Sequence, residues 1–181
     1  MKRVVVILLA FGCFEAKAQN MFMTRHGQVS FFSKTPMENI DAVNNEVASA
    51  LNSQTGDIGF NILVKSFHFE RALMEEHFNE NYMESDKIPK ASFKGKIGNL
   101  AAVDFSKDGS YAVVAEGEMT VHGVIQKISI PGNITIKAGL PRVTAKFKLA
   151  PKDYNIKIPG LVADKIADSM NVAVDCKYEK K

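Results

Sequence analysis

Two alternating runs of side chains, separated by only two residues, constrain the fold of this chain more than any other feature. The runs are Tyr111–Val121 and Val124–Ile136, and His122-Gly123 lies between them. A link of two residues joins neighbouring antiparallel strands in a tight hairpin. The two faces of the first run differ, because one is small and apolar and the other is mostly polar. The apolar face holds Val113, Ala115, Gly117, Met119 and Val121, and the other holds Val114, Glu116, Glu118 and Thr120.

The small apolar face is open to two interpretations. Small inward-facing residues leave space inside a closed barrel, as in barrels that hold one ligand. The same residues also suit a filled core, in which they pack beneath phenylalanines from opposite strands. The residues alone favour neither interpretation over the other.

Further β-like runs account for most of the chain beyond Thr24. Turn residues separate them, for example Thr55-Gly56-Asp57 and the Asp-Gly hairpin signal in Lys107–Ser110. The segment Ile40–Leu51 is ambiguous, because its apolar spacing also suits one face of a helix. About eight or nine strands with few helices predict an all-β sandwich or a closed barrel. The other expected strands are Gln28–Ser33, Ile58–Phe69, Ala91–Ile97, Leu100–Ser106, Arg142–Leu149 and Ile166–Tyr178.

A polar insert, Leu73–Phe93, interrupts this β-like pattern. It is rich in Asn and Glu, and such inserts commonly connect strands across the end of a sheet or barrel. Ile88-Pro89 ends it, because the residue before proline is displaced from helical geometry and proline lacks the amide that a central strand needs. We therefore expect a short helical insert and a new strand that begins near Lys90.

Two blocks of the sequence resemble the YceI-like, or polyisoprenoid-binding, proteins. The first is Glu75–Phe78 followed by Tyr82–Phe93, which is similar to the acidic-His turn, aromatic residues, proline and β-strand of that family. The second is Gly117–Ile130, which resembles the family's strand, His-Gly turn and following strand. With a matching layout of strands, the resemblance covers roughly residues 24–178. It implies an antiparallel, lipocalin-like β-barrel with a short helical insert, in which the ambiguous segment 40–51 is a strand.

The resemblance also implies a function. A protein of this family would bind a long apolar lipid, such as a polyisoprenoid or a fatty-acid derivative, and sequester it in the barrel without a covalent step. The insert and the loops at one barrel end would form the mouth of the cavity. We expect five apolar side chains to line the cavity and three polar side chains of the insert to meet a head group. These residues are Phe60, Phe67, Phe93, Met119 and Val121, with Glu75, His77 and Asn79.

The N-terminal residues have the pattern of a secretory signal peptide. Met1-Lys2-Arg3 is basic, Val4–Phe14 is apolar, and Ala16-Lys17-Ala18 supplies the small residues of a cleavage site. The apolar segment is too short to span a bilayer, so we expect no transmembrane anchor. Lipidation at Cys13 is an alternative, but the residues before Cys13 fit such a site poorly.

We therefore expect residues 1–18 to be removed and residues 19–181 to form a single domain, periplasmic or secreted. The whole chain carries 23 basic and 20 acidic residues, and loss of the signal peptide lowers the net charge from +3 to +1. With no basic stripe apart from Lys180-Lys181, a nucleic-acid partner is not expected. One cysteine, Cys176, remains, and we expect it to be a buried small hydrophobe without a disulfide partner.

Motifs for catalysis are missing from the sequence. The four histidines form neither a His-x-His nor a His-Glu-x-x-His pair, and no Gly-x-Ser-x-Gly or phosphate-binding glycine loop occurs. Glu76 and Glu80 would share a helix face near His77, but a solvated helical turn is the usual meaning of such a cluster. We therefore expect no enzyme, no cofactor and no metal site.

Two further possibilities for the function come from the sequence. The main alternative is an exported β domain with a filled core that acts through a protein partner or in a stress response. A hydrolase or metal enzyme is disfavoured by the missing motifs. Self-association into a homodimer is an additional expectation that no sequence feature decides.

Overall fold

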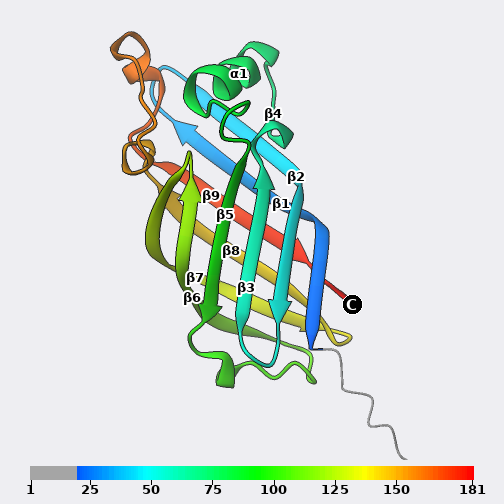
Figure 1. Ribbon diagram of the computed structural model, residues 1–181. Helices are drawn as coiled ribbons and strands as arrows, with labels where there is room; N and C mark the ends of the chain where they lie inside the picture. Colours follow the sequence, from blue (N-terminus) through cyan, green and yellow to red (C-terminus); the bar gives the residue numbers. More distant parts are fainter. Residues whose placement is uncertain (1–19) are drawn as a thin grey trace, which may run out of the picture.

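Eight strands form a closed antiparallel barrel in the computed structural model, which describes residues 20–181 (Figure 1). The signal peptide predicted for residues 1–18 lies outside the described residues. Strand β1 pairs with both β2 and β9, and this double pairing closes the sheet. The barrel strands are β1 (Met21–Lys34), β2 (Asn39–Asn52), β3 (Asp57–Leu63), β5 (Lys90–Ile97), β6 (Gly109–Val121), β7 (Val124–Lys137), β8 (Leu140–Leu149) and β9 (Met170–Lys177).

The remaining elements are short and lie in the connections or at the chain end. Strand β4 pairs with the beginning of β2, and β10 pairs with the beginning of β1. The insert forms a helix, α1, followed directly by a π-helical turn, η2. The bounds are η1 (Val64–Ser66), β4 (His68–Phe69), α1 (Ala72–His77), η2 (Phe78–Tyr82), η3 (Leu100–Ala102), η4 (Pro151–Tyr154), η5 (Gly160–Lys165) and β10 (Glu179–Lys180).

Strands that follow one another along the chain also lie side by side in the barrel. The expected tight turn between β6 and β7 is confirmed, because φ is +49° at His122 and +76° at Gly123. Two successive positive φ values are typical of the type I′ turn, whose twist matches that of the flanking strands. Ala138 and Gly139 form an equivalent turn between β7 and β8, with φ values of +51° and +74°.

The predicted alternation along β6 is also confirmed. Val113, Met119 and Val121 are buried inside the barrel, whereas Glu116 and Glu118 are exposed on its outer surface. Gly117 on the inner face is required by the close approach of β5, since a Cβ there would lie 2.2 Å from the Lys94 carbonyl oxygen.

The fold class predicted from the sequence, an antiparallel β-barrel with a short helical insert, is correct. The ambiguous segment 40–51 is a strand, β2, and a new strand begins at Lys90 as Ile88-Pro89 indicated. Strand β1 extends seven residues further toward the N-terminus than the expected segment Gln28–Ser33.

The strand predicted for Leu100–Ser106 is wrong. This segment contains η3 and then an irregular stretch. Asn99 fixes its beginning against β6, because its side-chain amide donates to the Ala112 carbonyl oxygen at 2.9 Å and its side-chain oxygen accepts from the Val114 amide at 3.1 Å. The apolar residues that imitated a strand pack instead against the buried cluster at the lower end of the barrel. They are Leu100, Val103 and Phe105.

The hairpin predicted at Lys107–Ser110 is consequently wrong as well, because no strand precedes it directly. These residues lead from the irregular stretch into β6. The Asp108 carboxylate accepts a hydrogen bond from the Ala138 amide at 2.8 Å and so connects this segment to the β7–β8 turn.

Two predicted strands have different bounds in the structure. The run Ile58–Phe69 ends as a barrel strand at Leu63, where the Asn44 side-chain amide donates to its carbonyl oxygen at 2.9 Å. The chain then turns through η1 before the short β4. The strand expected at Ile166–Tyr178 begins only at Met170, because the preceding residues follow η5 and the Ala167 amide donates to the Ser33 hydroxyl.

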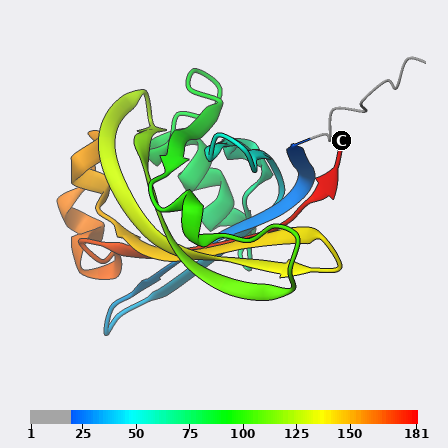
Figure 2. The ribbon, with the colours of Figure 1, turned by 90° about the horizontal axis from the view of Figure 1, so that it is seen from below.

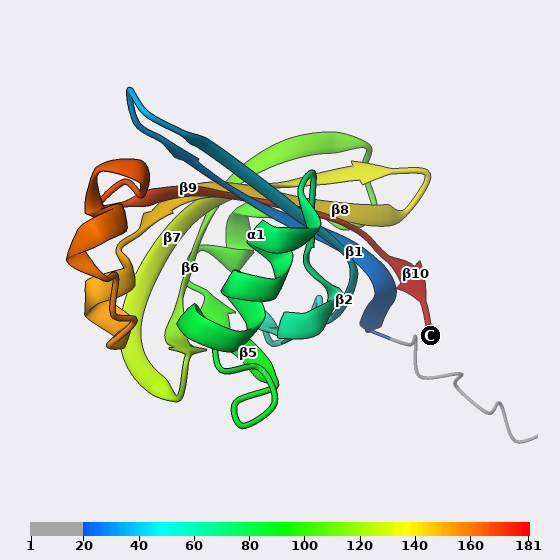
Figure 3. The same ribbon diagram turned by 90° about the horizontal axis from the view of Figure 1, so that it is seen from above.

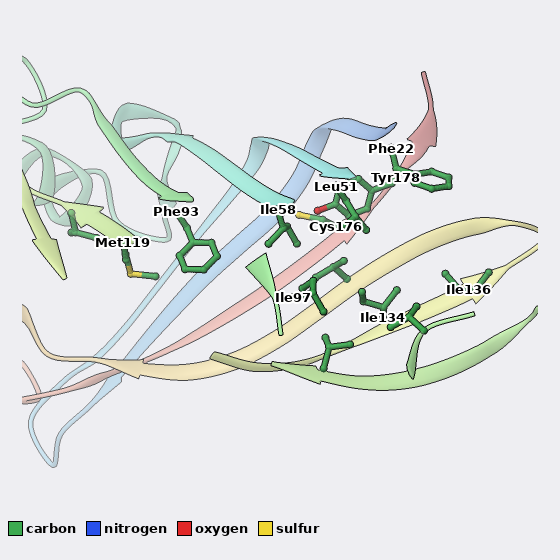
Figure 4. Close-up of a cluster of buried hydrophobic side chains, with 14 of the residues drawn as sticks. Phe22, Leu51, Ile58, Phe93, Ile97, Met119, Ile134, Ile136, Cys176 and Tyr178 are labelled. Carbon is green, nitrogen blue, oxygen red and sulfur yellow. The ribbon is translucent and has the colours of Figure 1, made fainter. Parts of the chain in front are cut away.

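Tightly packed apolar side chains fill the lower end of the barrel, the end that Figure 2 shows from below. Leu51 and Ile134 have no exposed surface, and Ile136 is 2% exposed. Figure 4 shows this cluster, with Phe22 and Tyr178 on one side and Phe93 and Met119 on the other. We call the part of the cluster around Phe22, Leu51, Ile134, Ile136, Cys176 and Tyr178 the packed end.

Cys176 is buried as expected, with no exposed surface. Burial raises the pKa of its thiol to about 12. Gly27 lies against it, since a Cβ on Gly27 would come within 2.4 Å of the Cys176 sulfur. Tyr178 shares a hydrogen bond of 2.6 Å with the hydroxyl of Ser49, which satisfies a polar group inside this end.

Candidate functional site

An apolar cavity of about 470 Å³ occupies the upper half of the barrel. All eight barrel strands contribute side chains to its wall, and α1 and η2 lie over the barrel opening above it (Figure 3). Its volume falls within the range of about 300–1,000 Å³ that is typical of ligand pockets. The packed end therefore occupies only part of the interior, and the upper part is hollow.

The floor of the cavity rests on the packed end. Ile58 and Ile97 line the cavity and are 4% and 3% exposed, so they belong to both regions. Val113 and Val143 complete this boundary from β6 and β8. Small wall residues such as Ala115, noted in the sequence as a means of keeping a barrel open, lie just above.

Four phenylalanines gather beneath α1 at the upper end of the cavity. The ring centroids of Phe31 and Phe67 are 5.4 Å apart, and those of Phe69 and Phe78 are 5.0 Å apart. Phe31 also contacts Phe69 and Phe78, at 5.8 and 5.5 Å. These separations are within the range that aromatic pairs prefer. The cluster joins β1 and the 64–69 segment to the insert, and it gives the upper wall a continuous aromatic surface.

One face of the helical insert lines the cavity. Met74 and Phe78 are four residues apart, so they lie on one face, and both line the cavity with Tyr82. The Glu75 carboxylate accepts a hydrogen bond from the Phe69 amide at 3.2 Å, and the Asn79 side-chain amide donates to the Glu75 carbonyl oxygen at 2.9 Å. The first bond holds the helix against β4, and the second lies within the insert.

A second set of polar contacts fixes the C-terminal end of the insert. Glu84 forms an ion pair with Lys87 at 2.6 Å and lies 3.4 Å from the His122 Nε2 atom. The Lys87 ammonium group, with a smaller contribution from His122, holds the pKa of Glu84 below its ordinary value. The Nδ1 atom of His122 lies 3.3 Å from the Tyr154 carbonyl oxygen. The β6–β7 turn therefore contacts both the insert and η4.

Polar groups form a minor part of the cavity wall. The charged ones are Glu38, Arg71 and Lys165, and they all lie in connections at the upper end. Arg71 donates to the Glu38 carboxylate at 2.5 Å. The remaining polar lining residues are His77, Tyr82, Ser92 and Thr144.

The structure brings most of the sequence-predicted site residues to this cavity. The five apolar candidates and His77 line it, although ligand contact by any of them stays a prediction. Glu75 and Asn79 lie on the same insert but are not among the lining residues. The Glu75 carboxylate bonds to the Phe69 amide, and the Asn79 side-chain nitrogen bonds to the Glu75 carbonyl oxygen. The lining candidates are Phe60, Phe67, Phe93, Met119, Val121 and His77.

Sequence reasoning missed other lining residues, and two of them carried a usable signal. Phe69 is two residues from Phe67, the spacing of one strand face, and Phe78 is four residues from Met74 on the helix. No local signal marks Arg71 or Lys165, which are far apart in the sequence and line the same cavity only in the folded chain.

Two general searches of the described residues gave negative results. Within residues 20–181, no group of three or more His, Cys, Asp or Glu side chains is placed to hold a metal ion. In the same part of the chain, every helix is too short or too polar to cross a membrane.

Known structures share the fold of this barrel. A polyisoprenoid-binding domain from Saccharophagus degradans, implicated in plant cell wall breakdown, superposes with a TM-score of 0.77 at 13% identity, over 90% of this chain and 99% of that one. BcnA from Burkholderia cenocepacia gives a TM-score of 0.69 at 14% identity, over 84% and 96% of the two chains. The YceI protein of Campylobacter jejuni gives 0.57 at 14% identity, with both chains covered completely.

The fold and its cavity define an up-and-down β-barrel of the kind that encloses a ligand space. The sequence matches the YceI-like domain over residues 14–178, so the chain belongs to the YceI-like family. A comparison with curated protein sequences gave no match.

Proposed function

We propose that this protein binds one long apolar lipid, a polyisoprenoid or a fatty-acid derivative, in the barrel cavity and carries or sequesters it without a covalent step. The observation that carries this proposal is the cavity of about 470 Å³, with a wall made almost entirely of apolar side chains. A structural relative from Saccharophagus degradans is a polyisoprenoid-binding domain, which makes isoprenoids the first ligands to test.

The apolar wall supplies a sufficient driving force for binding. A lipid chain that buries about 500 Å² would gain on the order of 12 kcal/mol at ~25 cal/mol per Å², before the entropic costs of association. Phe60, Phe67, Phe93, Met119 and Val121 would contact the chain, and the insert lies over the barrel opening above them.

The filled-core alternative predicted from the sequence receives less support. Only the packed end is filled, whereas the upper half of the interior is hollow. Action through a protein partner would not require that hollow half.

Native mass spectrometry of the mature protein, followed by denaturing extraction and lipid identification, tests the proposal. We expect a bound lipid at a ratio of one to one that is lost on denaturation. An empty protein that also takes up neither isoprenoids nor fatty acids in a titration would contradict the carrier function, and a search for protein partners would then take its place.

We also propose that the protein is exported, with residues 1–18 removed and residues 19–181 forming the mature domain in the periplasm or the medium. The basic, apolar and small-residue segments of the N-terminus support this. The intact mass of protein from fractionated host cells tests it. A mass that begins at Gln19 in an extracytoplasmic fraction is expected, and full-length protein confined to the cytoplasm would contradict it.

A further inference from the structure

The charges that line the cavity are gathered at its mouth and do not balance. Glu38 lies in the β1–β2 connection, Arg71 precedes α1, and Lys165 ends η5. Figure 3 shows α1 over the opening with the orange segment that contains η5 at the side. The floor and walls below these residues carry no charged side chain among the described lining residues. A ligand in this cavity would therefore meet charge only at the upper end.

Pairing leaves one of the two cations at the mouth uncompensated. Arg71 forms its ion pair with Glu38 at 2.5 Å, so these two charges offset each other. Lys165 forms no salt bridge within residues 20–181 and is exposed. The lining therefore has an excess of one positive charge.

Apart from Glu38, the carboxylates of the insert and of the segment around Lys165 do not line the cavity. Glu75 is turned to the Phe69 amide, and Glu76 and Glu80 are exposed on the outer side of the insert. Asp164 and Asp168 flank Lys165 in the sequence, but neither comes within ion-pair distance of it in the structure. An anionic group at the mouth would thus find the Lys165 ammonium available.

We propose that the cavity selects a long-chain carboxylate, with the chain in the apolar interior and the carboxylate at Lys165. This inference rests on the proposed lipid-binding function and names the class of ligand. One uncompensated cation matches one negative charge, which favours a fatty-acid carboxylate over an uncharged alcohol or a multiply charged phosphate. Arg71 is a second contact that becomes available only when its pair with Glu38 opens.

Four ligands with the same chain test the charge preference directly. The assay measures displacement of a neutral fluorescent probe from the wild-type protein at pH 7.5 by oleate, oleyl alcohol, oleylamine and oleyl phosphate. We expect oleate to bind about threefold more tightly than the alcohol, with the amine weakest. The advantage of oleate should shrink in high salt, because an exposed charge pair is screened.

Three variants test the residues. Lys165→Gln is expected to weaken oleate binding to about the level of the alcohol, so that most of the preference for oleate is lost. Lys157→Gln is the matched control, since this exposed lysine is close in sequence but does not line the cavity. Glu38→Gln is expected to strengthen oleate binding about threefold by freeing Arg71. All three changes are outside the barrel core, and a thermal melt of each variant confirms that it is folded.

The outcomes separate this inference from the function on which it rests. Equal binding of oleate and the alcohol, unchanged by Lys165→Gln, would overturn the carboxylate selection and leave the carrier function standing. Tighter binding of oleyl phosphate or of the amine than of oleate would also overturn it. Failure of all four ligands to displace the probe would overturn this inference, and it would overturn the proposed function as well if isoprenoids also fail to bind in the titration described above.

Discussion

At the lower end of the barrel Leu51 and Ile134 have no exposed surface, whereas at the upper end Phe31, Phe69 and Leu149 are only partly buried and face a cavity. Both ends are built from the same eight strands and from similar apolar side chains. The lower end is sealed by the 98–108 connection, whose apolar residues pack against the cluster, while the upper end is covered by a helix. The two ends of one continuous barrel therefore differ both in the segment that covers them and in how densely the interior is filled.

We expect the two ends to contribute differently to the stability of the fold. Dense packing in the lower end supplies stability, because each buried apolar group makes contacts on all sides. Side chains of the upper end lose part of those contacts to the cavity and so contribute less to folding.

The largest expected effect is the loss of stability when the packed end is hollowed. Leu51→Ala should lower the free energy of unfolding by about 3–4 kcal/mol, because it leaves a cavity in a region that cannot collapse. Leu149→Ala, the same change in the cavity wall, should cost about 1 kcal/mol. Urea denaturation with an unchanged m value measures both. Equal losses at the two positions would contradict the comparison.

A smaller loss is expected where β5 and β6 approach most closely. Gly117→Ala places a Cβ against the Lys94 carbonyl oxygen, so the strands must separate, at a cost of about 2 kcal/mol. Gly59→Ala is the control, because nothing lies closer than 3.8 Å to its Cβ, and we expect a change within about 0.5 kcal/mol. Thermal and urea unfolding report both variants, and a tolerated Gly117→Ala would show that the spacing of β5 and β6 is not fixed.

The hollow end was predictable from the sequence only in part. The alternation of β6 and the His122-Gly123 turn identified the hairpin and its inner face, and the family resemblance implied the barrel. Composition could not decide between a cavity and a core, because small residues such as Ala115 are compatible with both. The two ends differ in the segments that cover them. The segment at the lower end includes Leu100–Ser106, whose sequence pattern resembled that of a strand.

The candidate site shows the same limit. Phe67 and Val121 were chosen as apolar residues in or beside predicted strands, and they line the cavity. Arg71 and Lys165 were missed because only closure of the barrel brings residues 94 positions apart in the sequence to one cavity. Glu75 and Asn79 were chosen for their polarity, but the Glu75 carboxylate bonds to the backbone of β4 and the Asn79 side-chain nitrogen bonds to the backbone of the insert.

Filling the cavity should affect binding more than folding. Ala115→Phe places a large side chain in the hollow half and is expected to weaken binding of an apolar lipid by about tenfold or more, while the free energy of unfolding changes by less than about 1 kcal/mol. Ala112→Phe, on the exposed face of the same strand, should leave binding unchanged. If Ala115→Phe binds lipid as the wild type does, the chain does not occupy this cavity.

The smallest expected effect is a dependence of stability on pH at the outer surface of the lower end. Arg142 pairs with Asp175 and holds the pKa of that carboxyl below its ordinary value of 3.8. A depressed pKa in the folded state stabilises the protein above about pH 4, and this stabilisation is lost as the pH falls through the folded-state value. Because the pair is partly exposed, it contributes only about 0.5 kcal/mol.

Urea denaturation of the Asp175→Asn variant between pH 7 and pH 2 measures this contribution. The variant should be less stable than the wild type at pH 7, and the two should converge in acid. Asp168→Asn, which removes an exposed carboxylate without an ion pair in the described residues, should follow the wild type. A constant difference between Asp175→Asn and the wild type at all pH values would exclude titration of Asp175 as the cause.

The central claim is that the lower end of the barrel is filled and that the hollow upper end binds the lipid. Methyl NMR during a lipid titration tests it most directly. Isoleucine, leucine and valine methyl groups occur in both ends, so each end reports separately. We predict that lipid shifts the resonances of Ile62, Val121, Leu149 and Val172 in the cavity wall and leaves those of Leu51, Ile134 and Ile136 unchanged. Shifts confined to the outer surface, or equal shifts at the two ends, would contradict the account.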